Sequence, residues 1–113
     1  MKLKIIALLG LLAVNLPAQD YTMFRVKGNS MLPKFKNGDV VVIDKEFPYH
    51  MLQVNDIVCF NDPEYSEQYS TCHRVVMKTV KGFISKGDNN FLCDGNYVTP
   101  QGYIGKVVRI ISE

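Results

Sequence analysis

Ser30 and His73 are the residues of this sequence whose types favour nucleophilic chemistry. Ser30 lies between Gly28-Asn29 and Met31-Leu32-Pro33, where a strand is expected to end and a constrained turn to begin. Such a turn can expose a hydroxyl and direct backbone N–H groups toward one point, as an oxyanion hole requires. A serine needs an adjacent base, and an imidazole titrates in the useful range. Taken singly, a serine beside a glycine is usually a turn residue, and a strand histidine is more often one satisfied by a backbone carbonyl.

A carboxylate would complete such a site by accepting the Nδ1 proton of the imidazole and fixing its tautomer. Two candidates follow the expected strand 82–86, namely Asp88 and, six residues later, Asp94. Both fall in a polar, glycine-containing segment, where aspartates commonly stabilise turns instead. The other histidine, His50, lies in an expected loop and receives little catalytic weight.

Short strands are the elements expected to position these residues. Runs rich in β-branched and aromatic residues alternate with turn signals such as Asn37-Gly38-Asp39 and Lys81-Gly82. No long helical period follows Ala18. The pattern predicts an all-β domain, a small folded sheet or barrel-like fold, with strands at 21–27, 40–43, 57–60, 70–80, 82–86 and 103–111.

Composition is that of one ordinary globular domain. The chain has 113 residues, of which 47% are hydrophobic and 21% charged, so disorder is not expected. The net charge of +2 comes from scattered residues, which does not favour nucleic acid as a partner. The three cysteines lack the spacing of a zinc site. They are expected as buried strand residues or, if the domain is exported, as one disulfide and an odd thiol whose pairing stays open.

The N-terminal segment has the order of features found in a secretory signal. Lys2 and Lys4 precede an apolar run from Ile5 to Val14, and Pro17-Ala18 closes it. The uncharged stretch of about 15 residues would span roughly 22 Å as a helix, which is short against a bilayer core of about 30 Å. We therefore expect an apolar helix within residues 1–20, either a cleaved signal peptide or a membrane anchor. Both alternatives place a domain of residues 21–113 outside the membrane.

Read together, these segments resemble the catalytic domain of type I signal peptidases. Lys27 to Pro33, followed by Gly38-Asp39, is similar to the G-x-S-M-x-P…G-D motif of that family. Four further segments match later family motifs in the same order, so the resemblance runs from about residue 26 to 108: Asn55 to Phe60, Cys72 to Val76, Lys86 to Asn90, and Tyr103 to Val107.

His73 decides which branch of the family is resembled. Most bacterial members have lysine at this position, whereas His73-Arg74-Val75 is similar to the endoplasmic-reticulum and archaeal branch. The resemblance implies Ser30 as nucleophile, His73 as general base and Asp94 as the favoured orienting carboxylate, with Asp88 as the alternative. Gly28, Ser30 and Met31 are the implied oxyanion and substrate-binding positions. Because Gly28 has no hydroxyl, backbone N–H groups must serve the oxyanion.

The chain departs from the family pattern at Asn55. Asn55 stands where the family usually has glycine, and asparagine also accepts a left-handed backbone. The resemblance implies no metal and no organic cofactor.

The implied function is a serine endopeptidase that cleaves exported preproteins after small residues. Its partners would be a preprotein or peptide and the membrane, with the catalytic domain on the extracytoplasmic side. Three alternatives are kept. Self-cleaving repressor peptidases share the S-M…G-D layout but are cytosolic and use lysine, so the apolar run and His73 argue against them. The others are a dedicated processing peptidase for one partner substrate and a non-catalytic exported binding module of the same fold.

Overall fold

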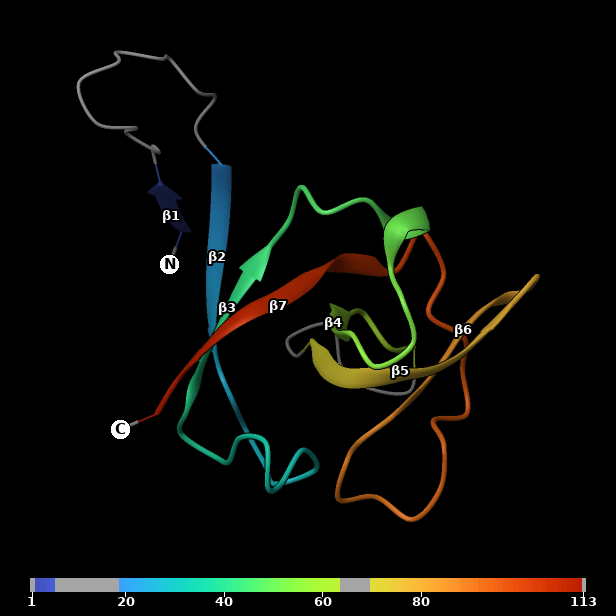
Figure 1. Ribbon diagram of the computed structural model, residues 1–113. Helices are drawn as coiled ribbons and strands as arrows, with labels where there is room; N and C mark the ends of the chain where they lie inside the picture. Colours follow the sequence, from blue (N-terminus) through green and yellow to red (C-terminus); the bar gives the residue numbers. More distant parts are fainter. Residues whose placement is uncertain (1, 6–18, 64–69, 113) are drawn as a thin grey trace.

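A single antiparallel sheet makes up the structure. The computed structural model describes residues 2–5, 19–63 and 70–112 (Figure 1). The sheet has seven strands, and one short 3-10 helix, η1 (Tyr49–Met51), accompanies them. The strands are β1 (Lys2–Ile5), β2 (Gln19–Arg25), β3 (Val40–Asp44), β4 (Ile57–Phe60), β5 (Thr71–Thr79), β6 (Gly82–Lys86) and β7 (Tyr103–Ile111).

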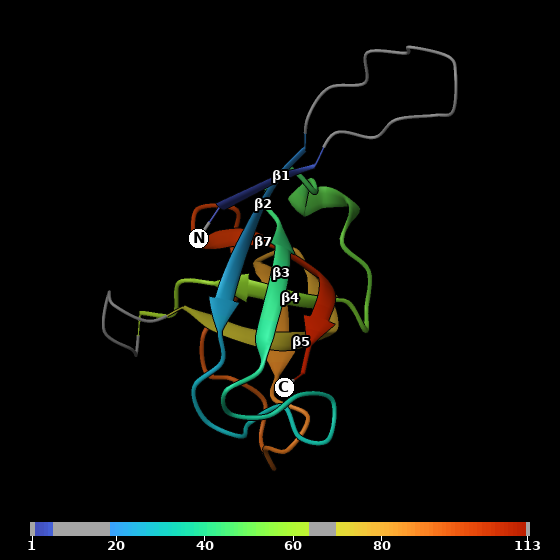
Figure 2. The same ribbon diagram turned by 90° about the vertical axis from the view of Figure 1, so that its left-hand side faces the viewer.

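The order of strands in space differs from their order in the chain. The sheet runs β1-β2-β3-β7-β4-β5-β6, so β7 lies between β3 and β4. Figure 2 shows β2 and β3 running across the direction of β4 and β5, because the sheet bends sharply between its two halves. Register irregularities in the pairing of β7 with β3 and with β4 lie at this bend, as expected of bulges that increase local twist.

The bent sheet encloses two clusters of buried side chains. One holds Met31, Phe35, Val41, Ile43, Ile57 and Cys59. The other holds Leu52, Val58, Phe60, Val75, Phe83 and Val98. Successive residues of β4 alternate between the two clusters, so the strand is covered on both faces. Burial on both faces explains why Ile57–Phe60 is a continuous apolar run instead of an alternating one.

The all-β class expected from the sequence is what the structure has, and most strands lie where they were predicted. β4, β6 and β7 have the predicted bounds. β3 is one residue longer than predicted at its end, and β5 is one residue shorter at each end. β2 starts earlier and ends at Arg25 instead of Lys27. The short helix η1 was not predicted.

The prediction of an apolar helix at the N-terminus is wrong for the residues that the structure describes there. Lys2–Ile5 form strand β1, which pairs with Gln19–Thr22 of β2. The alternation of lysine with an apolar residue over these four positions has the period of a strand, whereas the prediction took the lysines as the charged region of a signal segment. Residues 6–18, the rest of the expected helix, lie outside the described residues. Within the described ranges, no helix has the length and hydrophobicity needed to cross a bilayer.

A disulfide joins β4 to β5, a pairing that the sequence had left open. Cys59 and Cys72 are direct partners in the β4–β5 register, and their sulfur atoms are bonded. Cys93 is a free, exposed thiol. Because Cys72 immediately precedes His73, the covalent link fixes β5 at the residue next to the imidazole.

This link predicts a matched difference between cysteine variants. The bond closes a loop with a sequence separation of 13, for which chain-entropy arguments give roughly 3 kcal/mol of stabilisation. Cys59→Ala/Cys72→Ala should therefore lower the free energy of unfolding in urea by about that amount, while Cys93→Ala should stay within about 0.5 kcal/mol of wild type. Equal midpoints for wild type with and without reductant would contradict the assignment.

Candidate active site

The turn that carries Ser30 is built from residues just beyond the end of β2. Gly28 has φ +85°, a left-handed backbone that favours glycine. A Cβ on Gly28 would meet nothing within 4 Å, so the conformation, not the space, requires glycine here. Two hydrogen bonds then close the turn: the Gly28 N–H donates to Asn37 Oδ1 at 2.9 Å, and the Asn37 N–H donates to Asn29 Oδ1 at 2.9 Å.

Met31 holds this turn to the core from below. Its side chain is 1% exposed and packs in the first cluster with Phe35. The sequence resemblance had given Met31 a substrate-binding position, but its side chain is turned away from solvent and does not line the groove described below. Its packing in the protein interior instead anchors the neighbouring Ser30 relative to the hydrophobic core.

Asp39, from the Gly-Asp part of the motif, braces the far end of the same turn. Its buried carboxylate accepts the Lys36 N–H at 2.9 Å, and its carbonyl accepts the Val26 N–H at 2.7 Å. The backbone hydrogen bond from Lys36 lowers the pKa of Asp39, although burial acts in the opposite direction. This aspartate therefore supports the fold and does not face Ser30.

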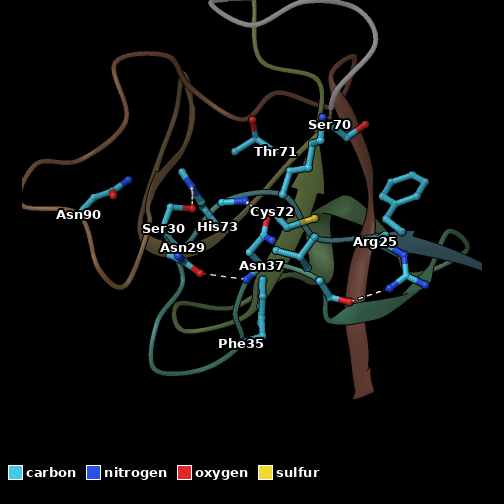
Figure 3. Close-up of a pocket in the computed structure, with 15 residues that line it drawn as sticks. Arg25, Asn29, Ser30, Phe35, Asn37, Ser70, Thr71, Cys72, His73 and Asn90 are labelled. Carbon is cyan, nitrogen blue, oxygen red and sulfur yellow. Dashed lines mark hydrogen bonds between the residues drawn. The ribbon is translucent and has the colours of Figure 1, made fainter. Parts of the chain in front are cut away.

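A chain of hydrogen bonds runs from Ser30 through His73 to Asp94, and Figure 3 shows its first part, between Ser30 and His73. Ser30 Oγ lies 3.0 Å from His73 Nε2, and His73 Nδ1 lies 2.6 Å from Asp94 Oδ2. His73 belongs to β5 and is 6% exposed, so its ring is held by the sheet. The three residues come from a turn, a strand and a loop, and only the fold brings them together.

Asp94 and Asp88, the two candidate carboxylates, have different partners. Asp94 contacts His73, whereas Asp88 forms a bidentate ion pair with Arg74 at 2.8 and 2.7 Å. The hydrogen bonds from Arg74 lower the pKa of Asp88. Arg74 is the neighbour of His73 on β5, and successive side chains of a strand point to opposite faces. Asp88 therefore serves the other face of β5 from the imidazole.

The environment of Asp94 determines the tautomer of His73. Burial alone would raise the pKa of Asp94, but hydrogen bonds from His73 and Ser85 and the charges of His73 and Lys86 outweigh it and lower the pKa. An ionised carboxylate can only accept hydrogen bonds. His73 Nδ1 must then carry its proton, which leaves the lone pair of Nε2 directed at the Ser30 hydroxyl. That is the arrangement a general base requires.

The segment Lys86 to Asn90 also contacts the turn that carries Ser30 directly. The Asn89 N–H donates to the Ser30 carbonyl at 2.8 Å, and Asn89 Nδ2 donates to the Asn29 carbonyl at 3.1 Å. A Cβ on Gly87 would lie 2.7 Å from the Ser30 carbonyl oxygen and 2.6 Å from Asn90 Nδ2. Gly87 therefore allows this loop to approach the turn closely.

An open groove of about 920 Å³ leads to Ser30 and His73. Phe24, Val26 and Phe35 give it apolar walls, and Ser70 to Cys72 form another side (Figure 3). β6 pairs with β5 only from Arg74 onward, so in the described part of the chain the first residues of β5 have β4 on one side and the groove on the other. Such a strand edge can bind an extended peptide by backbone hydrogen bonds.

The contacts of Ser85 with Asp94 and of Asn89 with the Ser30 turn were not predicted from the sequence. Ser85 lies in a predicted strand, where a serine carries no signal of a polar contact. The Lys86-Gly87-Asp88-Asn89-Asn90 motif did point to this loop, but only the fold reveals which of its groups reach Ser30.

The lowered pKa values of Asp88 and Asp94 predict acid sensitivity. A carboxylate whose pKa is lowered by folding stabilises the native state above its ordinary pKa, 3.8 here, and loses that contribution as the pH falls from there through the folded value. The free energy of unfolding should therefore fall with pH below about 5. Asp88→Asn should cost about 1 kcal/mol at pH 7, and its difference from wild type should shrink toward pH 3. Urea curves at several pH values measure this; a constant difference would contradict it.

Comparison with protein families adds an independent observation. A model of the family described as Peptidase S24-like matches residues 7–108. Searches of curated proteins and of solved structures gave no significant match. The family match indicates a fold of the serine-peptidase type but does not single out type I signal peptidases, so that narrower resemblance stays a prediction. Because the match covers most of the 113 residues, the chain belongs to the Peptidase S24-like family.

Proposed function

We propose that this protein is a serine endopeptidase that cleaves exported preproteins after small residues. The hydrogen-bonded chain Ser30–His73–Asp94 carries the proposal, with 3.0 and 2.6 Å between successive partners. Membership of a serine-peptidase family supports the reaction class. The preprotein as substrate and an extracytoplasmic location at the membrane rest on the motif resemblance and the apolar N-terminal run.

The reaction would proceed through an acyl-enzyme. Ser30 Oγ attacks the scissile carbonyl carbon while its proton passes to His73 Nε2. The imidazolium, stabilised by Asp94, then gives that proton to the leaving amine as the C–N bond breaks. A water molecule, deprotonated in turn by His73, attacks the ester carbonyl carbon. As the bond from that carbon to Ser30 Oγ breaks, the imidazolium returns the proton to Oγ, which restores the serine hydroxyl and the neutral imidazole.

Backbone N–H groups would stabilise the oxyanion. Among the described residues, the Ser30 N–H donates no hydrogen bond, and the turn that contains it is held by Asn37 and Asn89. A donor fixed before the reaction costs no reorganisation when charge develops on the carbonyl oxygen. Gly28, which presents no side chain at this place, leaves room for the substrate backbone.

An extended peptide is the substrate shape that suits the groove. The edge of Ser70 to Cys72 offers backbone groups, and the apolar walls of Phe24 and Val26 offer contacts for alternate side chains. Small side chains would allow the scissile bond to come close to Ser30 on its exposed turn.

Substitution of the three residues tests this proposal on a preprotein with an Ala-x-Ala site. With purified protein in detergent, Ser30→Ala and His73→Ala should each lower kcat by at least about 10³-fold. Asp94→Asn should lower it by about 10²- to 10⁴-fold because the wrong tautomer is favoured. Asp88→Asn is the matched control and should retain most of the wild-type kcat, since its partner is Arg74.

The outcomes separate the competing functions. Cleavage that survives loss of Ser30 or His73 would refute the mechanism. Labelling of Ser30 by a serine-reactive probe without preprotein cleavage would favour a dedicated peptidase with one partner. Neither labelling nor cleavage by folded protein would favour a non-catalytic binding module.

Gly87 provides a second test that leaves all three polar groups in place. In Gly87→Ala the new methyl group collides with the Ser30 carbonyl and Asn90, so the nucleophile turn must shift. We expect kcat/KM to fall by more than about 10-fold, because small misplacements of reacting groups are costly. Gly102→Ala, whose Cβ would lie 3.2 Å from the Asn61 carbonyl, is the control and should keep its activity. Unchanged activity in Gly87→Ala would show that the close contact of the Lys86 to Asn90 segment does not position Ser30.

A further inference from the structure

Asp94 occupies a loop that has little packing of its own. Its neighbours Phe91, Leu92, Cys93 and Gly95 are all exposed, Phe91 at 98%. Among the described residues of the segment between β6 and β7, Val98 forms one isolated bridge, to Phe83 of β6. Apolar contacts therefore do not explain why the Asp94 carboxylate stays in one place beside the imidazole.

Ser85 forms two hydrogen bonds with Asp94, one through its side chain and one through its backbone. Ser85, on β6, has a side-chain hydroxyl that donates to Asp94 Oδ2 at 2.6 Å. Its carbonyl accepts the Asp94 N–H at 2.8 Å. Ser85 is 0% exposed and pairs across the sheet with Val75 of β5, two residues beyond His73. The anchor thus sits on the strand next to the one that carries the base.

We propose that Ser85 is a positioning residue, whose hydroxyl holds the Asp94 carboxylate in place so that its Oδ2 accepts the hydrogen bond from the His73 Nδ1–H group. Both donors converge on that one oxygen, at 2.6 Å each. This inference rests on the proposed function for its catalytic consequence, while the hydrogen-bond arrangement itself does not.

The hydroxyl has a chemical effect besides its geometric one. A donor to the carboxylate stabilises its ionised form, which accepts but cannot donate. The proton shared with His73 therefore stays on Nδ1, and Nε2 remains the acceptor for Ser30. Removal of the hydroxyl leaves a partly buried carboxylate with one donor fewer, and burial then acts more strongly against its charge.

Three substitutions of Ser85 form the experiment. Ser85→Ala removes the hydroxyl, Ser85→Thr keeps it, and Ser85→Cys keeps the approximate shape with a weak donor. Thr79→Ala is the control, because it removes a hydroxyl that bonds the Gly82 carbonyl in the turn between β5 and β6, and it should keep the wild-type kcat. With a peptide substrate carrying an Ala-x-Ala site, Ser85→Ala and Ser85→Cys should lower kcat about 10- to 100-fold and leave KM within about 2-fold. Ser85→Thr should recover most of kcat.

A magnetic-resonance readout tests the same point without activity. The chain has two histidines, and His73→Ala assigns the signals. In wild type the ring nitrogen shifts should report a single tautomer of His73 with the proton on Nδ1. In Ser85→Ala or Ser85→Cys they should report a mixture of tautomers.

The outcomes distinguish this inference from the proposed function. If wild type shows no Ser30-dependent cleavage, the proposed function fails, and the tautomer shifts alone decide the role of Ser85. If wild type cleaves but the Ser85 variants keep both full kcat and a single tautomer, the role of Ser85 is refuted and the function stands. If Ser85→Ala does not fold, Ser85→Cys takes its place in both measurements.

Discussion

The site depends on a buried imidazole whose two nitrogens must both be satisfied. His73 is fixed by the sheet, and an unpaired polar atom at such a position is costly. Ser30 and Asp94 supply the two partners, so the turn after β2 and the loop after β6 are both drawn to the same strand. Phe60 packs edge-on against the ring at 6.4 Å. The geometry needed for catalysis and the geometry needed to bury this histidine are therefore the same.

Much of the fold was predictable because local signals agree with tertiary structure. The apolar run Ile57–Phe60 predicts β4, and the Lys81-Gly82 turn predicts the start of β6. Both signals are local in the sequence. The ends of β2 were less predictable, since Val26 continues the strand pattern but leaves the ladder where the backbone turns toward Gly28. β1 was missed because Lys2 and Lys4 were interpreted as the charged start of a signal segment and Ile5 as the start of its apolar run.

The site was predictable only in part, and the reason is register. Ser30 and His73 stand in recognisable motifs, but the choice between Asp88 and Asp94 lies in an irregular loop with no period to extrapolate. Likewise, Cys59 and Cys72 were expected in two successive strands of the chain, but only the pairing and register of those strands make them direct partners. The left-handed backbone expected at Asn55 is present, with φ 82°, because that requirement is local.

The central place of β7 has a consequence for how the molecule assembles. Among the described strands, β7 alone joins β2 and β3, next to the Ser30 turn, to β4 and β5, of which β5 carries His73. β7 also follows the other described strands in the chain. Such non-local pairing delays folding, because loop closure precedes the contacts that reward it. A nascent chain that lacks Tyr103–Ile111 has no sheet connecting its two halves. The approach of the Ser30 turn to His73 is thus expected only after β7 has been synthesised and has joined the sheet.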